Sequence, residues 1–531
     1  MTAQRSATAS APAMALPQTV LRPLGTYEQY SSSRNALGLY RNVITVCRYA
    51  LPAGLPPSED QTKARITAAL AAVVLERLPS LRVGIAGDDT KKPVFVTVPS
   101  LDLADHVEWV SRAPGLAADE YDALLARDLA RDNARAWPNV ETQPPWRLVV
   151  YLNTADGWAD LAFALHHSVG DGKSGLMFHT HLVEVLNSPS PAAAAASSVL
   201  TFTVLPALVP AQEDLIKFNI TWLFFIKTIW AELAPKWLKP APTAAYYAGP
   251  RVALYEHVLD GPLRLFHLSP TQAAAVLAGC RAHGTTLTAL IHGLQMVLFA
   301  RRTPADVASA FACVMPITTR VAIAPSSSAP PSPLPSSYKG PVTLDVNRQM
   351  GNFVCAHKHV YEPGMVADAR LVAPQEDEDK GKDDGKVWRA AAAVGAGLKA
   401  RVANLKTDNT MGLLGWVSDW HQYWRQQDGK IRESTWSVSN TGAIADGTTA
   451  SSTDSQWKLT RNFYSQSSLG KDSLISVNVG SVRGGDMSFV VAWHRGVVED
   501  AFAHSYADDL RDCLVRYADT GHFAVPHQLE V

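Results

Sequence analysis

The sequence predicts an α/β protein built from two domains. A chain of 531 residues is too long for one ordinary hydrophobic core. Short apolar runs typical of buried strands alternate with longer segments of helical periodicity, and this alternation favours layered α/β domains. The strongly apolar segment 218–237 separates two stretches of this texture. We therefore expect an N-terminal domain over 21–210, a linker over 211–250 and a C-terminal domain over 251–531.

The first domain follows a polar tail. Residues 1–17 are small and polar and lack the long apolar core of a secretory signal, so we expect 1–20 to be disordered. An Ala- and Leu-rich helix over 62–78 stops at Pro79, which cannot continue it. The other elements expected here are strands at 42–49, 94–98, 146–152 and 161–165 and a helix at 173–186.

The second domain opens with a clear helix start. Ser269 suits the N-cap position, Pro270 the first helical position and Gln272 the third. The expected elements are helices at 269–281, 286–301 and 501–517 and strands at 311–316, 436–438, 475–479 and 489–494. The Ser/Pro-rich segment 324–337 and the charged segment 375–386 are predicted to be solvated loop inserts.

The apolar segment 218–237 allows two interpretations. Lys227 and Glu232 interrupt it, which argues against a membrane span. We expect a linker helix over 211–250 packed between the two domains. The alternative is a helix that lies on a membrane surface, where Trp is favoured. We expect the protein to be cytoplasmic. The alternative is a protein that associates peripherally with the endoplasmic reticulum or with lipid droplets.

Composition excludes several classes of protein. Lys plus Arg number 48 and Asp plus Glu 49, so no overall field attracts nucleic acid. The five cysteines are scattered, odd in number and without CxxC spacing, which predicts free thiols in a reducing compartment. His179 and His181 lie two residues apart on a predicted helix and point to different faces. We therefore expect no metal site.

The heptapeptide His-His-Ser-Val-Gly-Asp-Gly, residues 166–172, carries the clearest chemical signal. It follows the predicted strand 161–165 and precedes the predicted helix 173–186. A His at the end of a buried strand is held rigidly and can face a cavity, which suits a general base at neutral pH. Gly170 and Gly172 allow the backbone to turn tightly beside it.

This motif resembles the HHxxxDG signature of the CoA-dependent acyltransferase superfamily, which includes chloramphenicol acetyltransferase, plant BAHD enzymes, condensation domains and fungal alcohol O-acetyltransferases. Further segments resemble the fungal alcohol O-acetyltransferases, in the expected order: 22–43, 78–85, 144–151, 284–302 and 437–442. No Asp-Phe-Gly-Trp-Gly motif of the BAHD type is present. The resemblance implies two chloramphenicol acetyltransferase-like α/β sandwich domains with an active-site channel between them.

The resemblance also assigns roles. His167 would be the general base and His166 an orienting residue. Asp171 would tie the turn to an Arg, for which the candidates are Arg41, Arg147, Arg320 and Arg348. Oxyanion donors facing the cleft would come from one or more of Ser437, Ser439 and Asn440.

The resulting prediction is an acetyl-CoA-dependent O-acetyltransferase that acts as a monomer. It would acetylate a small apolar alcohol or the hydroxyl of a secondary metabolite by direct attack on the thioester, without an acyl-enzyme. Two alternatives stay open. The acceptor could be an amine or the donor a longer acyl-CoA, since the base would be the same. The fold could also serve as a non-catalytic binding module.

Overall fold

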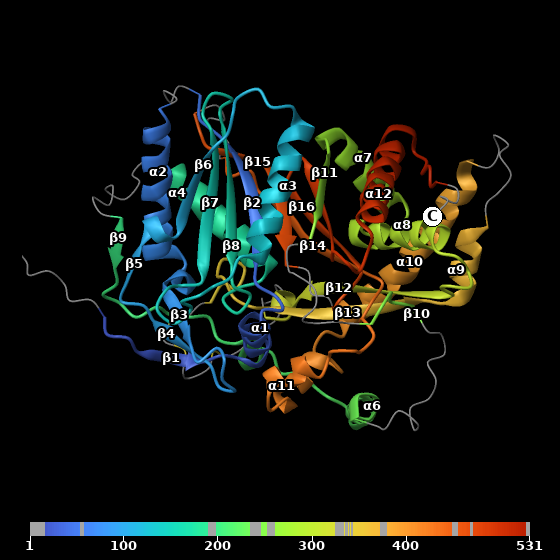
Figure 1. Ribbon diagram of the computed structural model, residues 1–531, viewed down its shortest axis with the longest axis horizontal. Helices are drawn as coiled ribbons and strands as arrows, with labels where there is room; N and C mark the ends of the chain where they lie inside the picture. The colour runs from blue at the N-terminus through green and yellow to red at the C-terminus, as the bar shows by residue number, and fades with distance from the viewer. Residues whose placement is uncertain are drawn as a thin grey trace, which may run out of the picture.

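A computed structural model shows the α/β architecture that the sequence predicts (Figure 1). The structure describes residues 16–53, 58–188, 198–233, 246–251, 261–323, 334, 338, 340, 344–371, 380–448, 455–467 and 471–526. The predicted tail lies largely outside this part of the chain, as do most of the Ser/Pro-rich segment and residues 234–245 of the predicted linker.

The first half of the chain builds a five-stranded sheet of order β15-β2-β8-β7-β6. Its strands are β2 (Val43–Ala50), β6 (Val107–Ser111), β7 (Trp146–Asn153), β8 (Trp158–Leu165) and β15 (Lys458–Gln466). Only the β6–β7 pair is parallel. Helices α2 (Glu59–Ala72) and α4 (Gly172–Leu186) contribute to the core on one face, and α3 (Ala118–Ala134) covers the other.

The second half builds a seven-stranded sheet of order β10-β12-β14-β16-β17-β11, with β13 paired to β12. The strands are β10 (Tyr246–Tyr247), β11 (Leu263–Leu268), β12 (Ala310–Thr318), β13 (Val354–Tyr361), β14 (Trp436–Ile444), β16 (Ile475–Val482) and β17 (Met487–Trp493). Its core is completed by α7 (Pro270–Ala282), α8 (Leu287–Arg302), α9 (Pro363–Arg370), α10 (Lys380–Ala403) and α12 (Asp500–Thr520). The Ser269 cap forms as predicted, with its side chain accepting from the Gln272 N–H.

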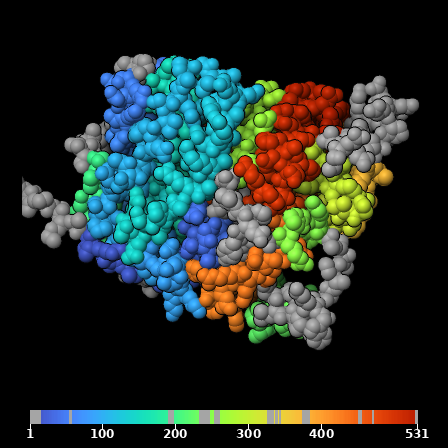
Figure 2. All heavy atoms as spheres, viewed as in Figure 1, coloured from blue at the N-terminus to red at the C-terminus, as the bar shows by residue number. Residues whose placement is uncertain are grey.

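Smaller elements surround the two sheets. Strands β1 (Val20–Pro23), β3 (Val83–Ala86) and β4 (Val94–Thr97) form a three-stranded sheet, and β5 (Ser100–Asp102) pairs with β9 (Val199–Thr201). The remaining helices are α1 (Thr26–Ala36), α5 (Gln212–Leu215), α6 (Trp222–Leu233) and α11 (Trp420–Arg425). The two halves of the chain occupy opposite sides of the molecule, as the colours of Figure 2 show.

One strand crosses between the halves. β15 comes late in the chain, yet it pairs antiparallel with β2 of the first sheet. Gln466, at its end, donates to Asn478 of β16 in the second sheet at 3.1 Å. The strand therefore connects the two sheets beside the end of β8, where the His-His motif begins. The boundaries drawn from the sequence, which assign all of 251–531 to the second domain, leave this crossover out.

Two local expectations need correction. The predicted helix 62–78 ends as an α-helix at Ala72 and continues as a π-helical turn over Val73–Arg77. In the charged segment 375–386, residues from Lys380 onward are the first turns of α10 and not a solvated insert. Asp383 in this segment forms an ion pair with the buried Arg301, and the pair fixes this end of the helix. The two residues are far apart in the chain, so the local sequence does not reveal the pair.

The linker helix is also placed differently from the expectation. α6 does not pack between the domains along its described side chains: Trp222 is 80 % exposed and Trp230 49 %. Thr221, just before the helix, donates hydrogen bonds from its N–H and its hydroxyl to the carboxylate of Asp408. Of the helices in the described part of the chain, none is both long and apolar enough to cross a bilayer.

Candidate active site

A cavity of about 220 Å³ lies where the two sheets meet, and we call it the His167 cavity. His167 and Asp171 enter it from the turn after β8, and strands β12, β14, β15 and β16 supply much of the opposite wall. The cavity therefore exists only because both halves of the chain contribute to it. Its wall includes all three second-domain residues singled out from the sequence, Ser437, Ser439 and Asn440.

His167 is the half-buried imidazole of this cavity. The side-chain amide of Asn352 donates to its backbone carbonyl at 2.6 Å and fixes the backbone at this point. The rings of Tyr40 and Tyr27 lie 5.6 and 6.1 Å from the imidazole, centre to centre. Burial, assisted by the positive charge of Arg34, lowers the pKa of His167 to about 4. The ring is therefore uncharged at neutral pH and able to accept a proton.

His166 faces the interior instead. It is fully buried, and its Nδ1 accepts from the N–H of Ser168 at 3.0 Å, which shapes the turn. Burial lowers its pKa to about 3, so it too is neutral. This placement is that of a residue that holds the turn, while its neighbour faces the cavity.

Asp171 caps helix α4 and has no acceptor capacity left over. Its Oδ1 accepts from the N–H and hydroxyl of Ser174, each at 3.0 Å. Its Oδ2 accepts from Arg320 at 2.5 Å and from the N–H of Phe353 at 3.0 Å. Burial raises the pKa of this carboxyl, but Arg320 and the hydrogen bonds outweigh burial and lower it. Among the four arginines left open by the sequence, Arg320 is the partner.

The two motif glycines allow close packing. A side-chain carbon on Gly172 would lie 3.0 Å from the ring of Tyr464, and one on Gly170 would lie 2.7 Å from Ser174. Both positions leave no room for a Cβ without a shift of the neighbour. The turn is therefore held against β15 on one side and against α4 on the other.

The three residues of β14 differ in how far their side chains are already engaged. Asn440 donates to Thr288 at 3.1 Å and accepts from the N–H of Gly442 at 2.8 Å. Ser437 and Ser473 share a hydrogen bond of 3.1 Å, whereas Ser439 only accepts a long bond from Gln466. The two serine hydroxyls can rotate toward the cavity, whereas the amide of Asn440 is fixed elsewhere.

Sequence reasoning missed several residues of this site. Arg34 is 4 % exposed and lies over the rings of Tyr30 and Tyr40, each at 4.4 Å. Asn352, which holds His167, comes from a loop whose local sequence carries no distinguishing signal. The acidic residues Glu433 and Asp472 also line the cavity. Arg34 and the three tyrosines Tyr27, Tyr30 and Tyr40 lie inside segment 22–43, which was singled out for its family resemblance. An Arg among tyrosines is the signal that could have drawn attention to them.

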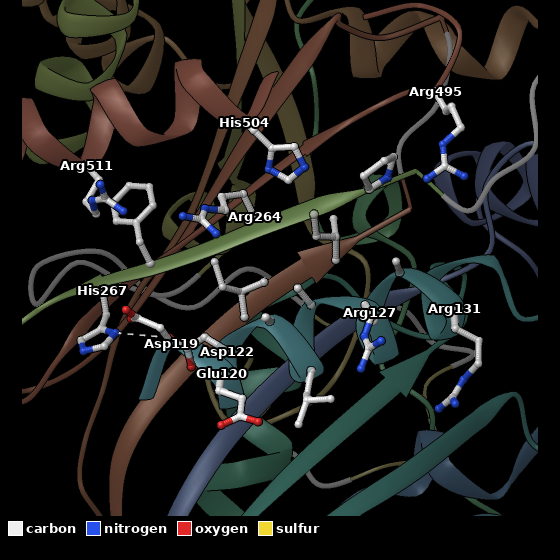
Figure 3. A pocket seen from close by; sticks show the side chains of 18 of the residues that line it. Asp119, Glu120, Asp122, Arg127, Arg131, Arg264, His267, Arg495, His504 and Arg511 are labelled. Carbon is white, nitrogen blue, oxygen red and sulfur yellow. Dashed lines mark ion pairs between the residues drawn. The ribbon is translucent and has the colours of Figure 1, made fainter. Parts of the chain in front are cut away.

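A second, larger cavity of about 970 Å³ lies between α3 and β11, and we call it the charged cleft. Figure 3 shows its side chains, with Arg127, Arg131 and Arg495 toward one end and an acidic group beside His267 at the other. Its wall also carries Arg264, Arg511 and His504.

Metal-ligating groups do not gather at either place. Within the described ranges, no three His, Cys, Asp or Glu side chains are arranged to hold a metal ion. His179 contacts the hydroxyl of Tyr49 at 2.9 Å, and His181 contacts the carbonyl of Arg348. All five cysteines are buried and unpaired.

Comparison with known proteins shows which family the chain resembles. The alcohol acetyltransferase family model matches residues 132–327, a span that includes the His-His motif. A probable alcohol acetyltransferase of Fusarium pseudograminearum, FCK4, is 27 % identical over 95 % of this chain and 97 % of its own length. The chain is thus similar to alcohol acetyltransferases over nearly its whole length. The predicted acyltransferase enzyme is thereby confirmed.

A second relative and more distant structures agree with this similarity. A second relative, the probable alcohol acetyltransferase crmB of Aspergillus fumigatus, is 23 % identical over 90 % of the chain and 96 % of its own length. The TRI3 trichothecene 15-O-acetyltransferase of Fusarium sporotrichioides superposes with a TM-score of 0.65 at 12 % identity, covering 94 % and 96 % of the two chains. The first condensation domain of the CDA synthetase gives 0.55 at 12 % identity, covering 96 % and 99 %. These structures show the same fold.

Proposed function

We propose that the protein transfers the acetyl group of acetyl-CoA to the hydroxyl of a small alcohol, with His167 as general base. The observation that carries this proposal is the position of His167: a neutral imidazole in a cavity walled by both sheets, with its backbone held by Asn352. A positioned base of this kind contributes about 10² to 10⁴-fold to rate.

The reaction needs no acyl-enzyme. His167 takes the hydroxyl proton as the acceptor oxygen attacks the thioester carbonyl. The tetrahedral intermediate collapses with cleavage of the C–S bond, and the imidazolium returns its proton to the departing thiolate. Ser437 and Ser439 are the candidate donors to the oxyanion, because their hydroxyls line the cavity and can rotate. Asp171 and His166 hold the turn and take no proton, since all four bonds of the Asp171 carboxylate are used within the fold.

The acceptor proposal rests on the lining of the cavity. Tyr27, Tyr30 and Tyr40 give it an aromatic side suited to an apolar alcohol or to a hydroxyl on a terpenoid-like secondary metabolite. The neighbour TRI3 is by name a trichothecene 15-O-acetyltransferase, which supports a metabolite acceptor. The experiment is incubation with acetyl-CoA and a panel of alcohols, following free thiol. His167→Ala should lower turnover by about 10² to 10⁴-fold, whereas the exposed His522→Ala should not lower it, and full activity of the His167 variant would overturn the mechanism.

One observation favours an amine acceptor as a second candidate. Asp472 lines the cavity, and burial together with the nearby Glu433 raises its pKa to about 6. Glu433 is paired with Lys471 at 2.5 Å, but no hydrogen bond or ion pair of the Asp472 carboxylate is found within the described residues. A carboxylate in this position suits a cationic acceptor. Competition between an amine panel and the alcohol panel, repeated with Asp472→Asn, distinguishes the two.

We also propose peripheral contact with a membrane through one surface, the apolar patch, formed by Trp222, Leu223, Ile226 and Trp230 of α6 with Trp416. These five side chains are 49–80 % exposed, and the ring of Trp416 lies 5.1 Å from that of Phe225. Tryptophan and aliphatic side chains on one face of a helix are typical of interfacial helices.

Residues of the turn that carries Trp416 of the apolar patch pack against residues that line the His167 cavity. The 3₁₀ turn Thr410–Trp416 places Met411 and Leu414 in a cluster with Tyr27 and Ile317, both of which line the His167 cavity. An apolar acceptor dissolved in a bilayer would thus meet the protein near its site. Flotation with phosphatidylcholine vesicles tests this: Trp222→Glu/Trp230→Glu should lose binding, and the control Val307→Glu/Ile431→Glu should keep it. Equal flotation of both variants, or none by the wild type, would refute membrane contact through this patch.

A further inference from the structure

Arg34 is a buried cation on the wall of the His167 cavity. It lies in the last turn of α1 and is 4 % exposed, yet it is one of the residues that line the cavity. A guanidinium has five N–H donors. Burial removes all of them from water, and this costs free energy unless the fold or a ligand supplies acceptors.

The fold itself satisfies few of these donors. Within the described residues, Nη2 donates one long hydrogen bond of 3.4 Å to the hydroxyl of Ser31, whereas Nε has no partner. No carboxylate in that part of the chain forms an ion pair with Arg34. The similarly buried Arg301, by contrast, donates two hydrogen bonds to Asp383 and two to backbone carbonyls. Arg34 therefore keeps donors that the fold does not use.

Aromatic rings hold Arg34 in place without using its N–H groups. The guanidinium carbon lies 4.4 Å from the ring centres of Tyr30 and Tyr40 and 5.7 Å from that of Trp424. A cation–π contact is made to the face of a ring and needs no hydrogen-bond acceptor. The side chain is thus fixed in position while its donors stay available.

One tyrosine ring separates Arg34 from His167. The ring centre of Tyr40 lies 4.4 Å from the guanidinium carbon and 5.6 Å from the centre of the imidazole. The guanidinium and the imidazole are therefore no further apart than these two distances together, which a small molecule can span. Tyr27 and Tyr30, stacked at 5.0 Å, also line the cavity. A molecule with its hydroxyl at His167 and its apolar body against these rings can place a second oxygen at Arg34.

Asp472 favours an uncharged oxygen at this position. It lines the same cavity, and its carboxylate and the guanidinium of Arg34 attract each other without a hydrogen bond or ion pair in the described part of the chain. A ligand carboxylate at Arg34 would be repelled by this aspartate, which offsets its attraction to the cation. A carbonyl oxygen accepts two N–H donors through its two lone pairs and adds no charge. The cavity therefore suits a ketone, ester or amide oxygen better than an anion.

We propose that Arg34 determines acceptor specificity by donating to a carbonyl oxygen of the acceptor. The acceptor would then be an alcohol that also carries a ketone, ester or amide group. This inference rests on the proposed function, in which His167 takes the proton of an alcohol in this cavity. It narrows the acceptor from apolar alcohols in general to hydroxy-carbonyl compounds.

The test compares three probes of nearly the same shape: 4-(hydroxymethyl)acetophenone, 4-isopropylbenzyl alcohol and 4-(hydroxymethyl)benzoate. They differ only in the para group, which is a ketone, a branched hydrocarbon or a carboxylate, and their meta isomers test a shorter spacing. Each probe is measured as a competitive inhibitor of acetylation of the best alcohol from the panel, with the ester of that alcohol followed by chromatography. A probe therefore need not be a substrate itself.

In the wild type, the inhibition constant of one of the two ketones should be about tenfold or more below those of the hydrocarbon and carboxylate of the same substitution pattern. This magnitude follows because hydrogen bonds from a charged donor are strong. Arg34→Met removes the donors and keeps an apolar side chain against the tyrosines, so the preference for the ketone should disappear. A merely structural role would weaken the binding of all probes alike and leave their ratio unchanged.

Arg82→Met is the matched control. Arg82 also lies over an aromatic ring, that of Phe202 at 5.5 Å, but it lies outside the set of residues that line the His167 cavity. This variant should keep the wild-type preference for the ketone. If Arg34→Met does not fold, the comparison of probes on the wild type still decides whether a carbonyl site exists.

Each outcome has a distinct meaning. If ketone and hydrocarbon inhibit the wild type equally, or neither inhibits, the carbonyl site is overturned while acetyl transfer stands. Stronger inhibition by the carboxylate than by the ketone overturns the assignment to an uncharged oxygen. A preference that survives in Arg34→Met, or that Arg82→Met loses equally, overturns the role of Arg34. If the wild type acetylates no alcohol of the panel, the proposed function fails, and the carbonyl site that rests on it fails too.

Discussion

The pair of Asp171 and Arg320 yields the sharpest prediction, because it separates a structural role from a catalytic one. Both side chains are almost fully buried, at 1 % and 3 % exposure, and their charged atoms lie 2.5 Å apart. Removing one partner of a buried pair costs about 3–5 kcal/mol, since the other charge stays buried alone. Arg320 keeps bonds to the carbonyls of Val346 and Gly351, so we expect Asp171→Asn to cost about 3 kcal/mol, at the lower end.

The double variant Asp171→Asn/Arg320→Gln removes both charges together. Its free energy of unfolding should be no lower than that of Asp171→Asn alone, which corresponds to a coupling of about 2–3 kcal/mol within the pair. Denaturant titration followed by tryptophan fluorescence measures these values. Both single variants should lose activity together with stability, because the turn that carries His167 loses its anchor to the second half of the chain.

A different result would refute this reasoning. If Asp171→Asn keeps wild-type stability but loses activity by about a hundredfold or more, the carboxylate acts on His167 directly, at the scale of a proton-transfer partner. A shift in the acid limb of the pH–rate profile for Asp171→Asn, absent for Arg320→Gln, would support the same conclusion.

Four further predictions concern the site and its surroundings. His167→Ala should lower kcat by about 10² to 10⁴-fold without changing the unfolding midpoint by much, and a midpoint drop that accounts for the loss would contradict a chemical role. Wild-type activity should decline only as the pH falls toward about 4, because a base must be neutral and the pKa of His167 is lowered to about 4; a decline centred at the usual value of about 6.5 would contradict the burial argument. His166, His167, His179 and His292 have pKa values lowered to about 3 or 4, so their contribution to stability is complete above the unfolded value of about 6.5 and is lost as the pH falls from there toward 4; denaturation midpoints at a series of pH values measure this. Gly175→Ala should destabilise by about 1–3 kcal/mol, since a Cβ there would collide with the side chain of Thr45 on β2, whereas Gly364→Ala, with open space around it, should not.

Much of this architecture can be predicted from the sequence because it depends on the pattern of apolar, polar and turn residues within short segments. Runs such as 161–165 and 146–152 are short, apolar and bounded by turn residues, and they form β8 and β7 within a few residues of the predicted ends. The capped helix after Ser269 begins where the cap places it. The heptapeptide itself combined a strand end, two histidines and a helix cap within one local segment, so its geometry could be anticipated.

The sequence-based predictions were wrong where residues far along the chain determine the structure of a segment. The charged segment 375–386 has the composition of a solvated loop, but Arg301 and His522 supply partners for Asp383 and Asp384 and help to anchor the beginning of α10. The apolar segment 218–237 has the composition of a buried helix, yet α6 lies on the surface along its described side chains. In both cases composition indicates whether a segment favours a buried or an exposed position. Residues far along the chain that pack against the segment determine where it lies.

The sequence by itself determined the two-part α/β texture, the motif and the family that the motif resembles, because each depends on residues close together in the chain. Only the tertiary structure chose Arg320 over three other arginines, and it brought Asn352 against the carbonyl of His167. It also moved β15 across to the first sheet, where the strand helps to wall the His167 cavity. These are contacts between residues more than 140 positions apart, and which of them form depends on how the two sheets pack, which no local pattern records.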